Sequence, residues 1–208
     1  MLQTPVRIHG SGRTDTGVHA LAQVFHFDAA WRGTPQQFVR AVATKLPAGV
    51  QVKTLRPVRR DFHAQHDARG KRYHYRIFLG NAGPFEAPWC WSWPRPLDWE
   101  RIEAAAACLR GRHDFAAFSA WNGDEKATTV RELHRLDIRR RGRRVRITLE
   151  ADGFLYKMAR SIVGALVAVG AGKLEPEAIE TLLRTGRRVP AVVTAPAQGL
   201  FLERVFYG

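Results

Sequence analysis

The chain has 208 residues, 45% of them hydrophobic, which excludes an intrinsically disordered protein and suits one large domain or two small ones. No apolar run is long enough to cross a membrane, no secretory signal pattern opens the sequence, and two cysteines, Cys90 and Cys108, do not suggest a disulfide framework, so we expect a soluble cytoplasmic protein. With 33 basic residues against 19 acidic ones the net charge is +14, which favours a polyanionic partner, nucleic acid first and an anionic membrane surface second.

A loop rich in small residues comes early in the chain. Residues 10–20 read GSGRTDTGVHA, with Asp15 as their one carboxylate. Apolar segments on both sides, Val6–Ile8 and Ala22–Phe27, read as strands. A loop held between two strands is a common place for a catalytic group. The alternative is a plain connection in which Asp15 makes only a local turn hydrogen bond.

The next segments alternate between helix and strand signals. Thr34, Pro35 and Gln37 form a capping box with proline at the first helical position, and the helical spacing continues to Leu46. Val50–Leu55 reads as a strand. Lys71–Phe78 is a strand by alternation, with one face aromatic and the other basic. The aromatic face suits packing in a sheet core, with the basic face solvated. Alternatively one of its tyrosines lines a base pocket, and spacing alone does not choose between Tyr73 and Tyr75.

Residues 81–96 are rich in proline, glycine and tryptophan and read as a linker. We therefore expect an N-terminal half over residues 1–80 and a C-terminal half over residues 97–208. Within the linker, Trp89, Trp91 and Trp93 suit either packing at the junction of the two halves or stacking on nucleic acid bases.

The C-terminal half reads as helix, hairpin, two helices and a last strand. In chain order these elements are Asp98–Arg110, the strands Val130–Ile138 and Arg144–Ala151, the helices Asp152–Gly170 and Pro176–Arg184, and the strand Leu200–Phe206. The hairpin turn, RRRGR over residues 139–143, is either a solvated charge cluster or a phosphate contact. The helix over residues 152–170 is apolar on most of its surface, and Arg160 stands on the remaining face beside small residues.

Several blocks of this sequence resemble one known family. GRTDTGVHA at residues 12–20, followed by QVFHF at residues 23–27, resembles the signature of the TruA family of tRNA pseudouridine synthases. GRHDFAAF (residues 111–118), Phe154 with MARSIVG (residues 158–164) and PAQGLFL (residues 196–202) are also similar. The family usually has alanine at Thr16, often asparagine at Ser161, and commonly glutamate at Gln198.

The resemblance implies a role for five residues. Asp15 would be the catalytic nucleophile and Arg160 its ion-pair partner. Tyr73 would line the base pocket, acting as a base, through water, or as a stacking platform. Arg13 would help to extract the target nucleotide from its stack, and Leu200 would pack near the catalytic carboxylate.

The resemblance also implies an architecture and a substrate. The fold would be α+β, with two ferredoxin-like, RRM-like sheet-and-helix halves that form the pseudouridine synthase fold around a central basic cleft. The enzyme would be a homodimer that isomerises uridine to pseudouridine in the tRNA anticodon stem-loop, at positions 38 to 40, without cofactor or metal. Family members normally carry an earlier strand and helix, so we expect this chain to be N-terminally truncated.

Two other functions remain open from the sequence. The first is a catalytically inactive RNA-binding fragment of the same fold. The second is a hydrolase that uses Asp15 with a metal ion, although His9, His19 and His26 lack the compact spacing of a zinc site.

Overall fold

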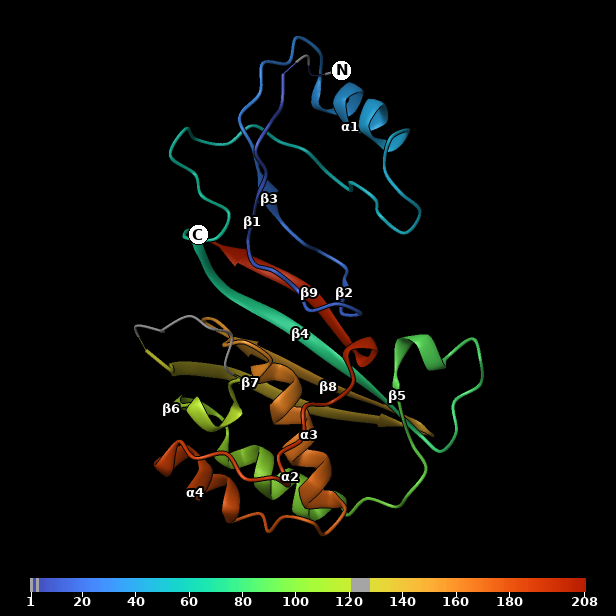
Figure 1. Cartoon of the computed structure of the whole chain (residues 1–208), viewed down its shortest axis with the longest axis vertical. Helices are drawn as coiled ribbons and strands as arrows, with labels where there is room; N and C mark the ends of the chain where they lie inside the picture. Colours follow the sequence, from blue (N-terminus) through green and yellow to red (C-terminus); the bar gives the residue numbers. More distant parts are fainter. Residues whose placement is uncertain (1, 3, 121–127) are drawn as a thin grey trace. The chain divides into compact units, whose positions relative to one another are not determined.

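The computed structural model describes residue 2, residues 4–120 and residues 128–208, and the descriptions below concern these residues. The chain divides into two compact units (Figure 1). The smaller unit comprises residues 1–12 and 24–67, and the larger comprises residues 13–23 and 68–208. The mixture of helices and sheets confirms the α+β class. The basic cleft and the boundaries at residues 80 and 97 stay predictions.

The smaller unit is built on a short two-stranded sheet and one helix. Strands β1 (His9–Gly10) and β3 (Phe25–His26) pair antiparallel. Helix α1 (Pro35–Ala43) begins with the predicted capping box at Thr34 and ends earlier than Leu46. The predicted strand Val50–Leu55 is wrong, because this segment has no ladder partner among the described residues and runs as irregular backbone.

The larger unit is organised by a mixed sheet. In the described residues its strands run in the order β2-β9-β4-β8-β7-β6, with β5 paired to the end of β4. The strands are β2 (His19–Ala20), β4 (Ala68–Leu79), β5 (Trp91–Trp93), β6 (Gly111–Asp114), β7 (Val130–Arg141), β8 (Arg144–Ala151) and β9 (Leu200–Tyr207). β2 lies parallel to β9, so the loop bearing Asp15 is joined to the last strand of the chain.

Three helices pack on one face of this sheet (Figure 1). They are α2 (Trp99–Cys108), α3 (Met158–Gly170) and α4 (Ala178–Thr185), and short 3-10 turns lie at Ala87–Trp89 (η1), Ala116–Phe118 (η2) and Ala197–Gly199 (η3). The predicted helix over residues 152–170 begins six residues late. Asp152 is tied to β7 instead, since its backbone N–H donates to the Glu132 carbonyl and its carboxylate accepts from the Glu132 N–H.

The core lies between the sheet and these helices. Tyr73, Tyr75 and Ile77 of β4 all face it and are buried, which confirms the aromatic face predicted for this strand. Alternate residues of β8, from Val145 to Ala151, are buried beside them. The opposite face of β4 is less uniform than predicted, because His74 is buried while Arg76 is exposed.

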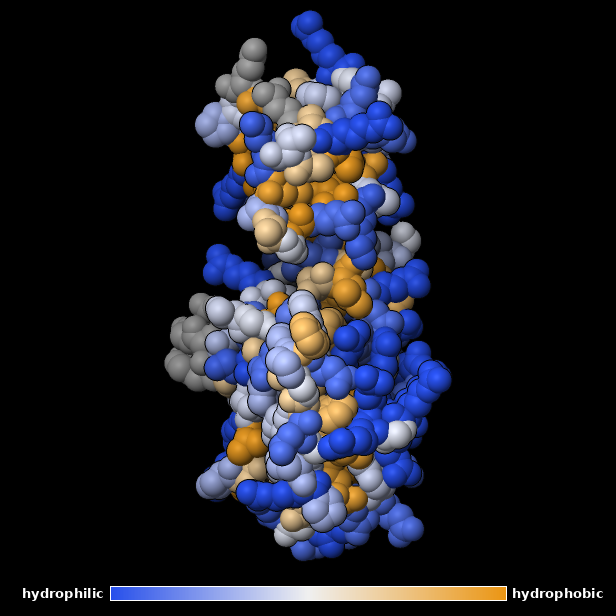
Figure 2. All heavy atoms as spheres, turned by 90° about the vertical axis from the view of Figure 1, so that its right-hand side faces the viewer, coloured by the Kyte–Doolittle hydropathy of each residue, from blue (hydrophilic) through white to orange (hydrophobic). Residues whose placement is uncertain are grey.

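The surface agrees with the composition. Hydrophilic residues cover much of the face shown in Figure 2, and hydrophobic residues lie between them in smaller groups. No helix of the described residues is both long and apolar enough to cross a membrane.

Candidate active site

The loop that carries Asp15 is held by short-range turns and by the sheet. The Val18 N–H donates to the Asp15 carbonyl at 3.0 Å, and Gly17 has φ of 82°, a left-handed conformation that favours glycine. Beyond the turn, Leu21 donates its N–H to the Leu202 carbonyl of β9 at 2.8 Å. The carboxylate therefore stands on a firmly connected turn.

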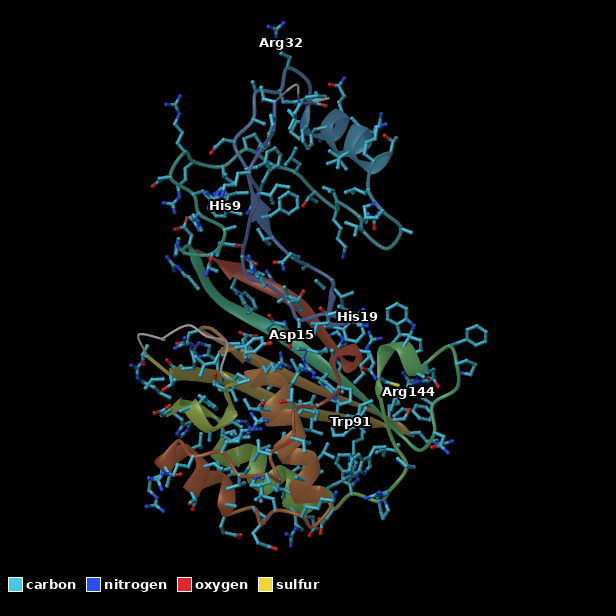
Figure 3. All side chains as sticks on the ribbon, viewed as in Figure 1. His9, Asp15, His19, Arg32, Trp91 and Arg144 are labelled. Atoms are coloured by element: carbon cyan, nitrogen blue, oxygen red, sulfur yellow. The ribbon has the colours of Figure 1, made fainter. Side chains whose placement is uncertain are left out.

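His19 fixes the far end of this loop (Figure 3). Its ring stacks on Phe201 of β9, with ring centroids 4.6 Å apart, and its centroid lies 4.7 Å from that of the Trp89 ring. Its Nε2 lies 3.2 Å from the carbonyl oxygen of Pro88. These contacts indicate that His19 stabilises the loop.

Arg160 of α3 meets Asp15 directly. Its Nη1 donates to Asp15 Oδ2 at 2.5 Å, and its Nε donates to the Ala195 carbonyl at 2.7 Å. The side chains of Arg160 and Asp15 are only 13% and 21% exposed. The predicted ion pair is thus present, between groups 145 positions apart in the sequence. Removing one partner of such a partly buried pair leaves an uncompensated charge and costs more free energy of folding than breaking a surface ion pair.

Residues 187–196 run across α3 and hold Arg160 in place; we call them the strap. The Ala195 N–H donates to the Arg160 carbonyl at 3.1 Å, so backbone and side chain of Arg160 both bond to one strap residue. The strap lies so close to α3 that a Cβ added to Gly164 would stand 1.9 Å from the Val193 carbonyl oxygen. Arg188 donates to Ser161 Oγ at 3.0 Å and also to the Val192 carbonyl.

The two tyrosines of β4 differ in their surroundings. Burial, together with the negative charge of Asp15, raises the pKa of Tyr73 to about 12. Its ring meets Phe154 edge-on at 5.0 Å. The Tyr75 hydroxyl instead donates to the Pro196 carbonyl at 2.7 Å, and burial raises its pKa well above the ordinary value. Tyr73 is therefore the tyrosine within electrostatic reach of Asp15.

The other two predicted residues lie at the edges of this group. Leu200 is buried at the start of β9, opposite Tyr75 in the ladder. Arg13 is exposed, and within the described residues the ion pair of Asp15 is made with Arg160 and not with Arg13. Its role in extracting the target nucleotide stays a prediction.

The strap is the part of the site that sequence reasoning missed. The small residues after Arg160 on α3 predict that something approaches closely, and Gly164 was the usable signal. Nothing in residues 187–196 themselves indicates a contact with α3. Lys157 was also missed: it precedes α3 with φ of 60°, a conformation uncommon outside glycine. The described residues include no group of three or more His, Cys, Asp or Glu side chains that could hold a metal ion.

Comparisons with known proteins match nearly the whole chain. A family model described as tRNA pseudouridine synthase matches residues 2–67 and 105–208. The tRNA pseudouridine synthase A of Solidesulfovibrio magneticus is 42% identical over 98% of this chain and 76% of its own length. The proteins of that name from Nitratidesulfovibrio vulgaris and Oceanobacillus iheyensis are 40% and 37% identical, over 83% and 80% of their own lengths.

Proposed function

Because the chain belongs to the TruA family of tRNA pseudouridine synthases, which are isomerases, we propose that Asp15 is the nucleophile that converts a uridine of tRNA to pseudouridine. The observation that carries this proposal is the ion pair of Asp15 with Arg160 beside Tyr73. A carboxylate, a guanidinium and an aromatic hydroxyl lie close together, which suits a reaction that needs a nucleophile and a firmly held uracil.

The reaction moves one bond and consumes nothing. The bond from uracil N1 to ribose C1′ breaks, and a bond from uracil C5 to C1′ forms. C5 loses its hydrogen to solvent as a proton, and N1 gains one. The Asp15 oxygen adds either to the uracil ring or to C1′ and leaves again in the second step, so that one difficult step becomes two.

Arg160 has two functions in this scheme. Its positive charge stabilises the ionised carboxylate that attack requires. Its planar guanidinium, bonded to both Asp15 and Ala195, also fixes the direction in which the carboxylate points. A nucleophile aimed within a fraction of an ångström accelerates the reaction by orientation alone.

Tyr73 suits a holding role better than a basic one. A pKa of about 12 keeps its phenol protonated near neutral pH, whereas an efficient general base has a pKa near the operating pH. The neutral hydroxyl can donate a hydrogen bond and the ring can stack on the uracil. We therefore propose that Tyr73 positions the base.

The finer parts of the proposal rest on family resemblance. We propose that the target uridines are positions 38 to 40 of the anticodon arm, and that Arg13 fills the place of the extracted base in the stack. A base in a stem must be extruded before it can be attacked, and an exposed arginine near the nucleophile suits that task. Leu200 would form the apolar floor near Asp15. We also propose a homodimer that acts on tRNA in the cytoplasm.

Release of the C5 hydrogen tests the nucleophile. With tRNA carrying tritium at uracil C5, we expect the enzyme to release tritium to solvent in step with pseudouridine formation. Asp15→Asn keeps the size of the side chain but has no nucleophilic oxygen anion, so it should lower the rate at least 1,000-fold, on the order of the effect of losing a catalytic nucleophile.

The controls separate the alternatives. If the wild-type chain were an inactive RNA-binding fragment, it would bind tRNA without releasing tritium. A metal-dependent hydrolase would lose its activity to a chelator and would cleave a bond of the substrate. Tritium release at the wild-type rate by a folded Asp15→Asn variant would contradict the assignment of Asp15.

A further inference from the structure

Arginines stand side by side on the face of the large sheet that faces away from α2, α3 and α4. Arg76 of β4, Arg146 of β8 and Arg139 of β7 occupy one cross-strand row. The next row holds Phe78, Arg144 and Arg141. Along the strands these residues alternate with Ile77 and Val145, which are buried against the helices, so their side chains lie on the opposite face of the sheet. Five arginines therefore share one sheet face over two adjacent rows.

This arrangement works against folding. Like charges directly opposite on neighbouring strands destabilise a sheet. Two of the five are compensated, since Arg146 bonds to Glu203 at 2.7 Å and Arg144 forms an ion pair with Glu86. The guanidinium carbon of Arg76 lies 4.2 Å from the centroid of the Phe201 ring, a cation-π contact. An anionic ligand on this face would relieve the repulsion between the arginines.

Arg139 and Arg141 are left for such a ligand. Both are exposed, and in the part of the chain that the structure describes neither side chain forms an ion pair or stacks on an aromatic ring. They lie on β7 at the hairpin that the charge run RRRGR forms. Their guanidinium groups are thus open to phosphate oxygens, which arginine binds through two parallel hydrogen bonds.

A hollow with an aromatic rim adjoins the two rows. It has a volume of about 670 Å³, and its lining includes Arg76, Arg139, Arg141, Phe85 and Trp89. The Phe85 side chain is 90% exposed and Trp89 is 46% exposed. Large exposed aromatic rings beside free arginines are the combination that nucleic acid strands use, with bases on rings and phosphates on cations.

The charge also decides between occupants. In a twofold dimer the same patch meets itself, so an interface centred here would place arginines against arginines. A lipid surface would meet a flat or convex face rather than a hollow. An RNA strand supplies both the phosphates and the bases that the hollow suits.

We propose that this face, the arginine rows with the Phe85–Trp89 rim, is a second RNA-binding surface that holds the backbone of the tRNA outside its target nucleotide. The proposal rests on the tRNA substrate proposed above and adds the contact site. It assigns a function to the charge run at residues 139–143 and to the exposed ring of Phe85.

Salt-dependent binding tests the arginines. The double variant Arg139→Ala/Arg141→Ala should weaken binding of an unmodified tRNA transcript about tenfold at 0.1 M salt. It should also reduce the slope of log affinity against log salt by roughly 1 to 2, one unit or less per lost phosphate contact. The control Arg112→Ala/Arg184→Ala removes the same charge from exposed positions on β6 and α4 and should change neither quantity.

Phe85 tests the aromatic rim. Phe85→Ala should weaken binding about tenfold, the scale of one lost base stack, and Phe85→Tyr should restore it because the ring is kept. Equal effects of the two double variants would show that only overall charge matters and would overturn the proposal. A change of particle mass in light scattering with unchanged tRNA affinity would assign the face to a second copy instead.

The two proposals fail in different ways. If the wild type releases no tritium from C5-labelled tRNA, the isomerase proposal fails whatever the binding data are. If the wild type is active and Arg139→Ala/Arg141→Ala has the wild-type KM for tRNA, only the second surface fails.

Discussion

Arg160 makes its two side-chain bonds through different nitrogens of one rigid plane. Arg160→Lys keeps the charge but cannot bond Asp15 and the Ala195 carbonyl together in the same geometry. We expect kcat to fall about 100-fold, with little change in tRNA affinity, because the carboxylate loses its direction. Arg160→Ala leaves Asp15 without its partner and should also lower the free energy of unfolding, by about 3 kcal/mol. Steady-state tritium release and urea unfolding measure the two effects. A lysine variant with wild-type kcat would contradict the positioning role.

His74 should make stability depend on pH. Burial, then the neighbouring charge of Arg146, lowers its pKa to about 4, against about 6.5 in the unfolded chain. Between these values the unfolded state binds the extra proton, so the free energy of unfolding falls as pH falls from about 6.5 to 4, by up to about 3 kcal/mol. His74→Gln should remove that part of the slope in urea unfolding measured from pH 7 to 4.5. His134→Gln, at an exposed position, is the control and should keep it. Equal slopes in all three proteins would contradict the assignment.

At the scale of elements, α3 and the strap depend on the absence of one side chain. Alanine favours a helix by about 1 kcal/mol over glycine, so Gly164→Ala would stabilise α3 if space allowed. The Val193 carbonyl leaves no space, and the strap must move away from Arg160. We expect a loss of activity of tenfold or more and a lower melting temperature. Gly83→Ala, where an added Cβ meets nothing within 4 Å, should change neither. A Gly164→Ala protein that is more stable and fully active would contradict this account.

Elements were predictable where their signals are local. The capping box at Thr34, the alternation of β4 and the apolar helix around Arg160 can each be identified in a window of about ten residues. Gly186 ends α4 with φ of 63°, as its position predicts. Val50–Leu55 has the sequence pattern of a strand but pairs with no other strand among the described residues. The sequence of a segment does not show whether a neighbouring strand is available for pairing. The late start of α3 likewise depends on bonds between Asp152 and β7.

At the scale of the whole molecule, the site could be anticipated only in part. The Asp15 and Arg160 blocks predicted the ion pair through resemblance to a family. Periodicity alone could not join two residues 145 positions apart. The strap and the parallel pairing of β2 with β9 had no sequence signal, because both are contacts between segments remote in the chain. The arginine rows needed the strand registers, which place Arg139, Arg146 and Arg76 in line.

The pairing of β2 with β9 has a consequence during synthesis. β9 lies between β2 and β4, so residues 200–207 must leave the ribosome before β2 can take its place in the sheet. The turn around Asp15 is made long before β9, yet β2 cannot pair until β9 has been translated. Contacts between such distant segments form slowly, because the chain loses the entropy of closing a long loop before the strand pairing stabilises it. A nascent chain arrested before Leu200 should therefore hold Arg160 in its helix while Asp15 is still unfixed.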